Sequence, residues 1–285
     1  MLASPPSARL DRCRGRRRRL QIARNVRCVT VGDRDNDVYL VSGERAAFID
    51  SGHGTDDEIA SLLDEWRDAG SPEVAAIVLT HRHLDHVGGA RALAAATGGV
   101  VVSSPVERSH IEDVGGEVGR TVKDGETLDL GGATLEFVHT PGHTMGSLCV
   151  LYREESVLFT GDTVLGTGTT SVNPEHGDME AYLDSLRRLL FYESDVIAPG
   201  HGPAIRQPKA NLEALIGHRL KRERQVLDMV GEAPSTVDDL FQALYARLDP
   251  RLHETARRQV RAHLAKLERE GRVLRTDAPE RYVLR

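Results

Sequence analysis

The chain has 285 residues, which exceeds the usual size of one globular domain and predicts one large and one small domain. Hydrophobic residues make up 40% of it and aromatic residues 4%, enough for a mostly aliphatic core, so disorder of the whole chain is excluded. No apolar run approaches the ~20 residues of a membrane span. Three scattered cysteines favour a reducing compartment over a disulfide framework. We expect a soluble protein without membrane contact.

The net charge of −6 is unevenly distributed along the chain. Residues 1–27 carry nine arginines and one aspartate, residues 28–218 carry 13 basic and 31 acidic residues, and residues 219–285 carry 15 basic and 11 acidic residues. An acidic middle is therefore flanked by basic ends, a pattern that can mark contact with nucleic acid or membrane. Because 33 of the 37 basic residues are arginine, genome composition explains this bias equally well.

Residues 1–24 form a basic segment that lacks the hydrophobic stretch of a secretory signal, so we do not expect export. Like-charged runs of this kind are usually disordered, and we predict a disordered leader. Arg-rich, acid-poor leaders are also typical of mitochondrial transit peptides, and a start codon placed too far upstream is another alternative. We predict a cytoplasmic protein, with a mitochondrial-type leader as the alternative.

Short apolar runs and amphipathic segments alternate from Val26 onward. A capping box at Thr55 and Glu58 predicts a helix that ends at Gly70, and further helices are predicted over 90–96 and 179–190. This alternation predicts an α/β domain over residues 25–217. Its expected strands cover residues 38–41, 46–49, 75–80, 100–102, 134–138, 147–152, 157–160 and 195–198.

The strand signals stop after Pro203. Three helical segments follow, over 211–230, 236–247 and 253–270, and then two short basic strands separated by a turn at 276–279. Helices followed by a hairpin predict a winged-helix module over residues 218–285, with 253–270 in the recognition-helix position.

Seven histidines and aspartates lie just beyond predicted strand ends. Strands that converge at one sheet edge would bring them together, and imidazole with carboxylate suits zinc in a site that keeps a position open for water. We predict two ions, one held by three histidines and a second held by one aspartate and two histidines, with another aspartate bridging them. In that order the residues are His81, His83 and His143; Asp85, His86 and His201; and Asp162.

A two-metal centre of this kind predicts hydrolysis. Divalent ions, Zn or alternatively Mn or Fe, lower the pKa of bound water from 15.7 toward ~7, so that hydroxide forms at neutral pH. Asp85 would orient it as the catalytic residue. For His176 and Thr169, in the loop after Asp162, we favour a turn without function. No metal role is expected for His53, His110, His139, His218, His253 and His263.

The order of these motifs resembles that of the metallo-beta-lactamase superfamily. Asp50, the stretch 80–89 (THRHLDHVGG), His143, Asp162 and His201 are similar to its five motifs and span about residues 28–205. The resemblance implies an αββα sandwich with metals at one edge. It also implies that Asp50 supports the histidine loop and does not bind metal.

Other stretches resemble the beta-lactamase-like protein 2 subfamily, in which a winged helix follows the hydrolase fold and a member cleaves single-stranded RNA. That resemblance implies an endoribonuclease. Two stretches depart from it, residues 34–37 (RDND, where the family has GTNT) and the generic 141–147 (PGHTMGS). A thioester or lactone hydrolase of the hydroxyacylglutathione hydrolase type is the alternative. The matching stretches are 161–170, 178–190, 199–205, 218–227 and 252–273.

Arginines lie on one face of the segment 253–270, opposite its apolar residues. We predict that Arg257, Arg258 and Arg261 contact nucleic acid, with a structural or dimerising role as the alternative, and a homodimer is left open. The partners considered are thus single-stranded RNA or a small ester or thioester. The non-enzyme alternative is a metal-stabilised transcription factor that reads duplex DNA.

Overall fold

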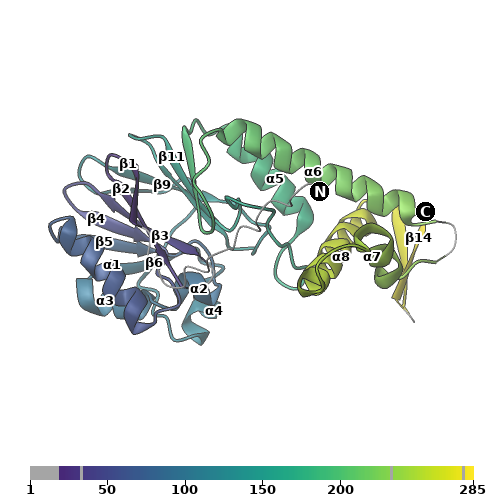
Figure 1. The fold of residues 1–285 in the computed structure, drawn as a ribbon, viewed down its shortest axis with the longest axis horizontal. Helices are drawn as coiled ribbons and strands as arrows, with labels where there is room; N and C mark the ends of the chain where they lie inside the picture. Colours follow the sequence, from purple (N-terminus) through teal and green to yellow (C-terminus); the bar gives the residue numbers. More distant parts are fainter. Residues whose placement is uncertain (1–18, 33–34, 232–233, 278–279) are drawn as a thin grey trace, which may run out of the picture.

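Two stacked β-sheets form the centre of the larger domain (Figure 1). The computed structural model describes residues 19–32, 35–231, 234–277 and 280–285. In spatial order, the first sheet contains β1 (Arg19–Ala23), β2 (Val26–Val31), β3 (Asn36–Ser42), β4 (Ala46–Ile49), β5 (Val74–Val78), β6 (Val100–Ser103) and β7 (Arg120–Thr121). The second contains β12 (Val196–Pro199), β11 (Val157–Gly161), β10 (Leu148–Tyr152), β9 (Thr134–His139) and β8 (Thr127–Asp129).

Helices cover the outer face of each sheet. Leu62 and Leu93 pack with Phe48 of the first sheet, whereas Leu183 and Leu212 pack in the cluster of Ile197 in the second. The layers are therefore helix, sheet, sheet, helix, which confirms the αββα sandwich. The helices on the first sheet are α1 (Asp56–Asp68), α2 (Leu84–Val87), α3 (Ala90–Thr97) and α4 (Arg108–Asp113), and those on the second are α5 (Met179–Leu189) and α6 (Pro208–Met229).

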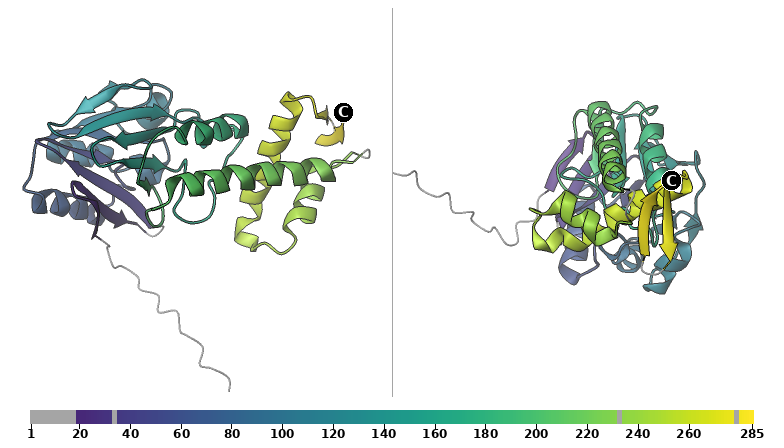
Figure 2. Two further views of the ribbon diagram at one scale, coloured as in Figure 1. Left: turned by 90° about the horizontal axis from the view of Figure 1, so that it is seen from above. Right: turned by 90° about the vertical axis from the view of Figure 1, so that its right-hand side faces the viewer.

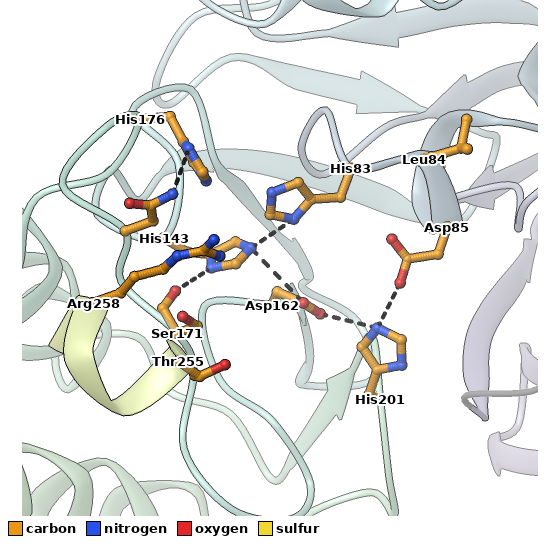
Figure 3. Close-up of a pocket in the computed structure, with 11 residues that line it drawn as sticks. His83, Leu84, Asp85, His143, Asp162, Ser171, His176, His201, Thr255 and Arg258 are labelled. Atoms are coloured by element: carbon orange, nitrogen blue, oxygen red, sulfur yellow. Dashed lines mark hydrogen bonds and ion pairs between the residues drawn. The ribbon is translucent and has the colours of Figure 1, made fainter. Parts of the chain in front are cut away.

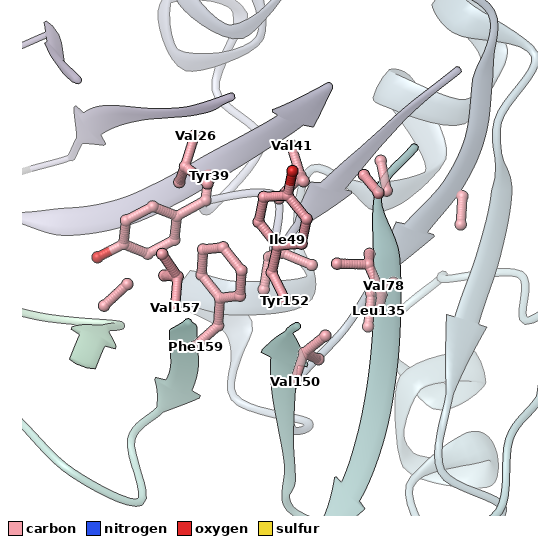
Figure 4. Close-up of a cluster of buried hydrophobic side chains, with 14 of the residues drawn as sticks. Val26, Tyr39, Val41, Ile49, Val78, Leu135, Val150, Tyr152, Val157 and Phe159 are labelled. Atoms are coloured by element: carbon pink, nitrogen blue, oxygen red, sulfur yellow. The ribbon is translucent and has the colours of Figure 1, made fainter. Parts of the chain in front are cut away.

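The core between the sheets is aliphatic and aromatic (Figure 4). Tyr39 and Phe159 face each other across it, with ring centroids 5.1 Å apart. Strand β4 explains the continuous apolar run at 46–49: Ala47 and Ile49 face this core, while Ala46 and Phe48 face the helices. Because both faces of the inner strands are buried, their sequences show no polar alternation.

The last part of the chain forms a winged helix with its own core, in which Leu240, Val260 and Leu264 pack against Tyr282. Helix α6 runs unbroken from the sandwich into this module (Figure 2), so the predicted boundary at 217/218 falls inside one helix. The elements are α7 (Val237–Tyr245), the 3-10 helix η1 (Pro250–Leu252), α8 (His253–Arg269), β13 (Val273–Asp277) and β14 (Glu280–Leu284).

The prediction of a disordered leader over residues 1–24 is wrong for residues 19–23. These residues form β1, which pairs antiparallel with β2. Ile22 is buried in the core between the sheets, a long-range contact that the polar character of this segment conceals. The first 18 residues lie outside the described part of the chain, as does part of the turn at 276–279. No helix among the described residues is long and apolar enough to cross a bilayer.

Candidate metal centre

The seven predicted residues lie together at one edge of the sandwich, on loops that follow strands (Figure 3 shows five of them). Loops that leave neighbouring strands at the same edge can place distant residues side by side. His81 and His83 follow β5, Asp85 and His86 lie in α2, and His143, Asp162 and His201 follow β9, β11 and β12.

Two groups of donor atoms are present. In the first group, His81, His83 and His143, the Nε2 atoms of His81 and His143 lie 2.9 and 3.0 Å from His83 Nδ1. In the second group, Asp85, His86 and His201, His201 Nε2 lies 3.3 Å from both His86 Nε2 and Asp85 Oδ2. Within the first group with Asp162, and within the second group, donor atoms lie within 4.8 Å of one another.

Asp162 lies between the groups. Its Oδ1 is 3.5 Å from His86 Nε2 and 3.6 Å from His201 Nε2, while its Oδ2 is 3.8 Å from His143 Nε2. Oδ1 is buried and has no hydrogen-bond partner among the described residues. One carboxylate oxygen thus faces each group, the arrangement that a bridging ligand requires.

The protonation states of the first group suit a cation. Burial and the neighbouring imidazoles lower the pKa of His83 to about 4, and burial lowers the pKa values of His81 and His143 as well. These three rings are therefore neutral at pH 7 and can offer nitrogen lone pairs.

Two carboxylates, Asp50 and Asp162, lie against the second group. Burial alone would lower the pKa of His86, but Asp50 and Asp162 outweigh it and raise the pKa well above its ordinary value. Burial likewise opposes ionisation of Asp162, yet His86 lowers that pKa to about 2. Carboxylates that favour positive charge on the His86 ring also favour a metal ion at its Nε2. The residues present therefore fit divalent cations.

Asp50 contacts the second group from behind. It directly follows β4 and has φ 64°, a left-handed conformation that is strained for an aspartate. Its Oδ1 accepts a hydrogen bond from Thr80 N at 2.8 Å, and its Oδ2 lies 2.7 Å from His86 Nδ1. A carboxylate on the far nitrogen of a histidine fixes the ring for metal binding. This geometry suits the supporting role implied by the resemblance.

In the first group, a main-chain carbonyl fixes the orientation of a histidine ring. His143 Nδ1 donates to Ser171 O at 2.7 Å. The loop that carries Ser171 also begins with Asp162, and Thr170 Oγ1 donates to Asp162 O within it. The conformation of this loop therefore bears on both His143 and Asp162.

The winged helix holds that loop in place. Arg219 of α6, 2% exposed, donates to Thr170 O and, at 2.8 Å, to Gln259 Oε1 of α8. Gln259 Nε2 donates to Val172 O at 3.1 Å. The sequence offered no signal for this network, because a buried arginine on a long helix cannot be told from an exposed one by its neighbours in sequence.

Asn36 is a further residue whose role the sequence analysis missed. It is fully buried, its side-chain amide donates to Asp85 O, and its backbone bridges to His201. The only signal was its place in the stretch 34–37, which departs from the subfamily. Close packing is also required at Gly200, where a Cβ atom would lie 2.9 Å from Asp162 Oδ1.

A cavity of about 630 Å³ opens onto the donor atoms, and α8 forms part of its wall (Figure 3). His176 lines the cavity, whereas the sequence predicts a turn without function at this position. Thr169 is exposed and does not line the cavity. The lining residues are His83, Leu84, Asp85, His143, Asp162, Ser171, Asn173, His176, His201, Thr255 and Arg258.

Of the three arginines predicted to contact nucleic acid, the structure brings only Arg258 to this cavity. Arg257 Nε is bonded to Asp238 at 2.6 Å, and its guanidinium lies over the ring of Phe241. Arg261 lies 3.9 Å from Glu254. The six histidines without a predicted metal role belong to neither donor group in the described part of the chain.

Comparison with known proteins agrees with this architecture. Residues 31–201 match the model of the metallo-beta-lactamase superfamily, and residues 236–281 match that of the beta-lactamase associated winged helix domain. The Beta-lactamase-like protein 2 homolog of Drosophila melanogaster is 32% identical over 266 residues, which cover 87% of each chain. The Atrochrysone carboxyl ACP thioesterase of Aspergillus fumigatus is 33% identical over 75% of this chain and 69% of its own.

Solved structures share the fold over nearly the whole chain. A metallo-beta-lactamase family protein from Thermus thermophilus has a TM-score of 0.78 at 24% identity and covers 93% of this chain and 100% of its own. A beta-lactamase domain protein from Burkholderia ambifaria has a TM-score of 0.82 at 21% identity, with 94% and 93% covered. The chain belongs to the metallo-beta-lactamase superfamily, as a metal-dependent hydrolase with a beta-lactamase associated winged helix domain.

Proposed function

We propose that this hydrolase cleaves an ester or thioester bond, lactones included, in a small acyl substrate at a centre of two divalent cations. The cavity carries the proposal: about 630 Å³, closed on one side by α8, is a volume typical of small-molecule sites. The relative named an acyl carrier protein thioesterase supports the same bond class. We expect zinc, with Mn or Fe as alternatives.

The proposal of two ions rests on the position of Asp162. Its two oxygens face the two groups of donors, so one ion would be held by His81, His83 and His143 and the other by the second group. Ions bound there would polarise the acyl oxygen and supply water of lowered pKa.

Asp85 has the position and the charge to orient a water molecule. Its side chain is 20% exposed and lines the cavity, 3.3 Å from His201. Burial would raise its pKa, but the hydrogen bond with His201 and the charge of His86 outweigh burial and hold the pKa below its ordinary value. The Asp85 carboxylate is therefore a weak base that can accept a hydrogen bond from a water molecule without taking its proton. This suits a role in orienting the water as it adds to the acyl carbon.

Cleavage of a phosphodiester in single-stranded RNA is the second candidate. The guanidinium of Arg258 beside the donor groups favours it, since arginine binds phosphate oxygens in pairs. Against it, Arg257 and Arg269 of the same helix are bonded at 2.6 Å to Asp238 and Asp178, which leaves little of a continuous basic face.

A side-by-side assay tests the proposal. The Zn-loaded protein would be given a hydroxyacyl-glutathione thioester, a lactone, a β-lactam, unstructured RNA and single-stranded DNA. We expect turnover of the thioester or lactone that is lost on chelation and in Asp85→Asn, and kept in the control His110→Ala. RNA cleavage that is faster than ester cleavage and depends on Asp85 would replace the proposal by the second candidate. Loss of stability on chelation with no turnover of any substrate would favour the DNA-binding alternative.

A further inference from the structure

Helix α8 contributes two side chains to the wall of the metal cavity. Thr255 and Arg258 are three residues apart, so they share one face of the helix, and both line the cavity with His83, His143 and Asp162. The side chain of Arg258 runs from the helix toward His143 (Figure 3). A module that could have been a separate nucleic-acid reader is thus part of the pocket.

The position of this face of α8 is fixed by contacts on both sides of it. Gln259, the neighbour of Arg258, is buried and hydrogen-bonded to Arg219 and to Val172 O. At the other end of the helix, Arg269 Nη2 lies 2.6 Å from Asp178 Oδ2. A guanidinium on a helix anchored in this way is organised before a ligand arrives, which lowers the entropic cost of binding.

Arg258 is bound less tightly by acidic side chains than Arg257 and Arg269 of the same helix. Its acidic partner among the described residues is Glu254, at 3.4 Å from Nε, and the two side chains are 45% and 59% exposed. Arg257 and Arg269 make contacts of 2.6 Å with Asp238 and Asp178. An ion pair as open as that of Arg258 is weak, so its guanidinium can exchange Glu254 for a ligand.

The rest of the lining away from the donor groups contains no carboxylate, no lysine and no second arginine. It consists of Leu84, Ser171, Asn173 and His176 together with Thr255. Arg258 therefore provides the positive charge of this wall, and its planar fork matches the two oxygens of a carboxylate or phosphate.

We infer that Arg258, with the hydroxyl of Thr255 beside it, binds an acidic group of the substrate at the α8 wall of the cavity, next to the donor groups. The preferred substrates are then acidic esters or thioesters, with a carboxylate in the acyl part or a phosphate in the leaving group. This inference deepens the proposed function and rests on it.

Matched substrates separate the two sources of the acidic group. Butyryl and succinyl thioesters of N-acetylcysteamine differ by a carboxylate in the acyl part, and butyryl thioesters of pantetheine and phosphopantetheine differ by a phosphate in the leaving group. We expect the wild type to hydrolyse the acidic substrate of one pair with a higher kcat/KM than its neutral counterpart. In Arg258→Gln, kcat/KM for that substrate should fall about 10- to 100-fold, mainly through KM, the range for loss of a charged hydrogen-bond partner.

The controls are chosen from the same helix and the same substrates. Hydrolysis of the neutral butyryl thioester should change less than about threefold in Arg258→Gln, and Arg261→Gln should keep the preference, because Arg261 does not line the cavity. Arg258→Lys keeps the charge without the fork and should give an intermediate loss. Thermal melting of each variant confirms that it is folded.

Calorimetric binding of succinate and of inorganic phosphate to the Zn-loaded protein makes the test independent of turnover. Equal kcat/KM for the neutral and acidic members, or an acidic preference that survives in Arg258→Gln, would overturn the inference and leave the proposed function intact. If no thioester or ester is hydrolysed but one anion binds in an Arg258-dependent way, the proposed function fails and the subsite stands. Absence of both hydrolysis and Arg258-dependent binding would overturn both.

Discussion

The two groups of donor atoms share Asp162 but depend on different parts of the chain. His86 of the second group is held by Asp50, inside the sandwich, whereas His143 of the first group is held by Ser171 O, in a loop bonded to Arg219 and Gln259. The winged helix therefore reaches the first group through His143 and the second group only through the shared Asp162. This difference predicts that packing between the modules affects the first group more than the second.

The largest effect is expected where the two groups meet. Asp162→Ala should lower the metal content from about two ions per chain to near zero, because its oxygens face both groups. Activity should fall by more than the roughly 10- to 100-fold typical of losing a residue that only hydrogen-bonds to a metal ligand. Elemental analysis after dialysis measures the content, and His110→Ala is the control. Two ions retained in Asp162→Ala would exclude a bridging role.

Asp50→Asn should act mainly on the second group. The amide cannot accept from Thr80 and His86 as the carboxylate does, so affinity for the second ion should fall roughly 10- to 100-fold. A smaller loss at the first ion is expected, since Thr80 Oγ1 also lies 3.0 Å from His81 Nδ1. Stepwise constants from chelator competition measure both. Equal losses at the two ions would remove the contrast between the groups.

Gln259→Ala should act mainly on the first group. It removes the hydrogen bonds to Val172 O and Arg219 and loosens the loop that orients His143. We expect affinity for the first ion to fall roughly 10-fold, the lower end for a partner of a ligand, with a smaller loss at the second ion through the shared Asp162. Co(II) titrations followed by absorption spectra separate the two. Gln242→Ala, exposed on α7, is the matched control. An effect confined to the second ion would show that the coupling is misassigned.

The smallest effect concerns acid stability of the winged helix. His263 is fully buried, and burial lowers its pKa below 6.5, so stability that is present above the unfolded pKa is lost as pH falls through about 6.5. Glu223 acts in the same direction at lower pH, because His263, 3.8 Å away, and the hydrogen bond from Lys266 at 3.1 Å outweigh burial and lower its pKa.

Replacement of the buried imidazole tests this dependence. In His263→Leu, the decrease in melting temperature between pH 7 and pH 5 should shrink by a few degrees, about the shift that 1 kcal/mol produces in a chain of this size. Calorimetry of the metal-free protein measures it, and His218→Leu on α6 is the comparison. An unchanged pH dependence would mean that His263 does not titrate in this range.

The positions of histidines and aspartates after predicted strands were enough to predict the seven residues that the structure brings together, and local spacing predicted the capping box of α1. A loop of six residues after a strand places its histidines together whatever the rest of the chain does, and Thr55 and Glu58 meet within one helical turn. The resemblance then supplied the order of the layers, which the sheets confirm.

Tertiary structure alone decided which long-range partners complete the site. Arg219 meets Thr170, 49 positions earlier, and Gln259 meets Val172 across 87 positions, because α6 and α8 pack against the sandwich with particular rotations. The pattern of α8 showed an arginine face, but only that packing directed Arg258 to the cavity and Arg257 to α7. Helical periodicity specifies the faces of a helix, whereas the neighbours of each face depend on how separate elements dock.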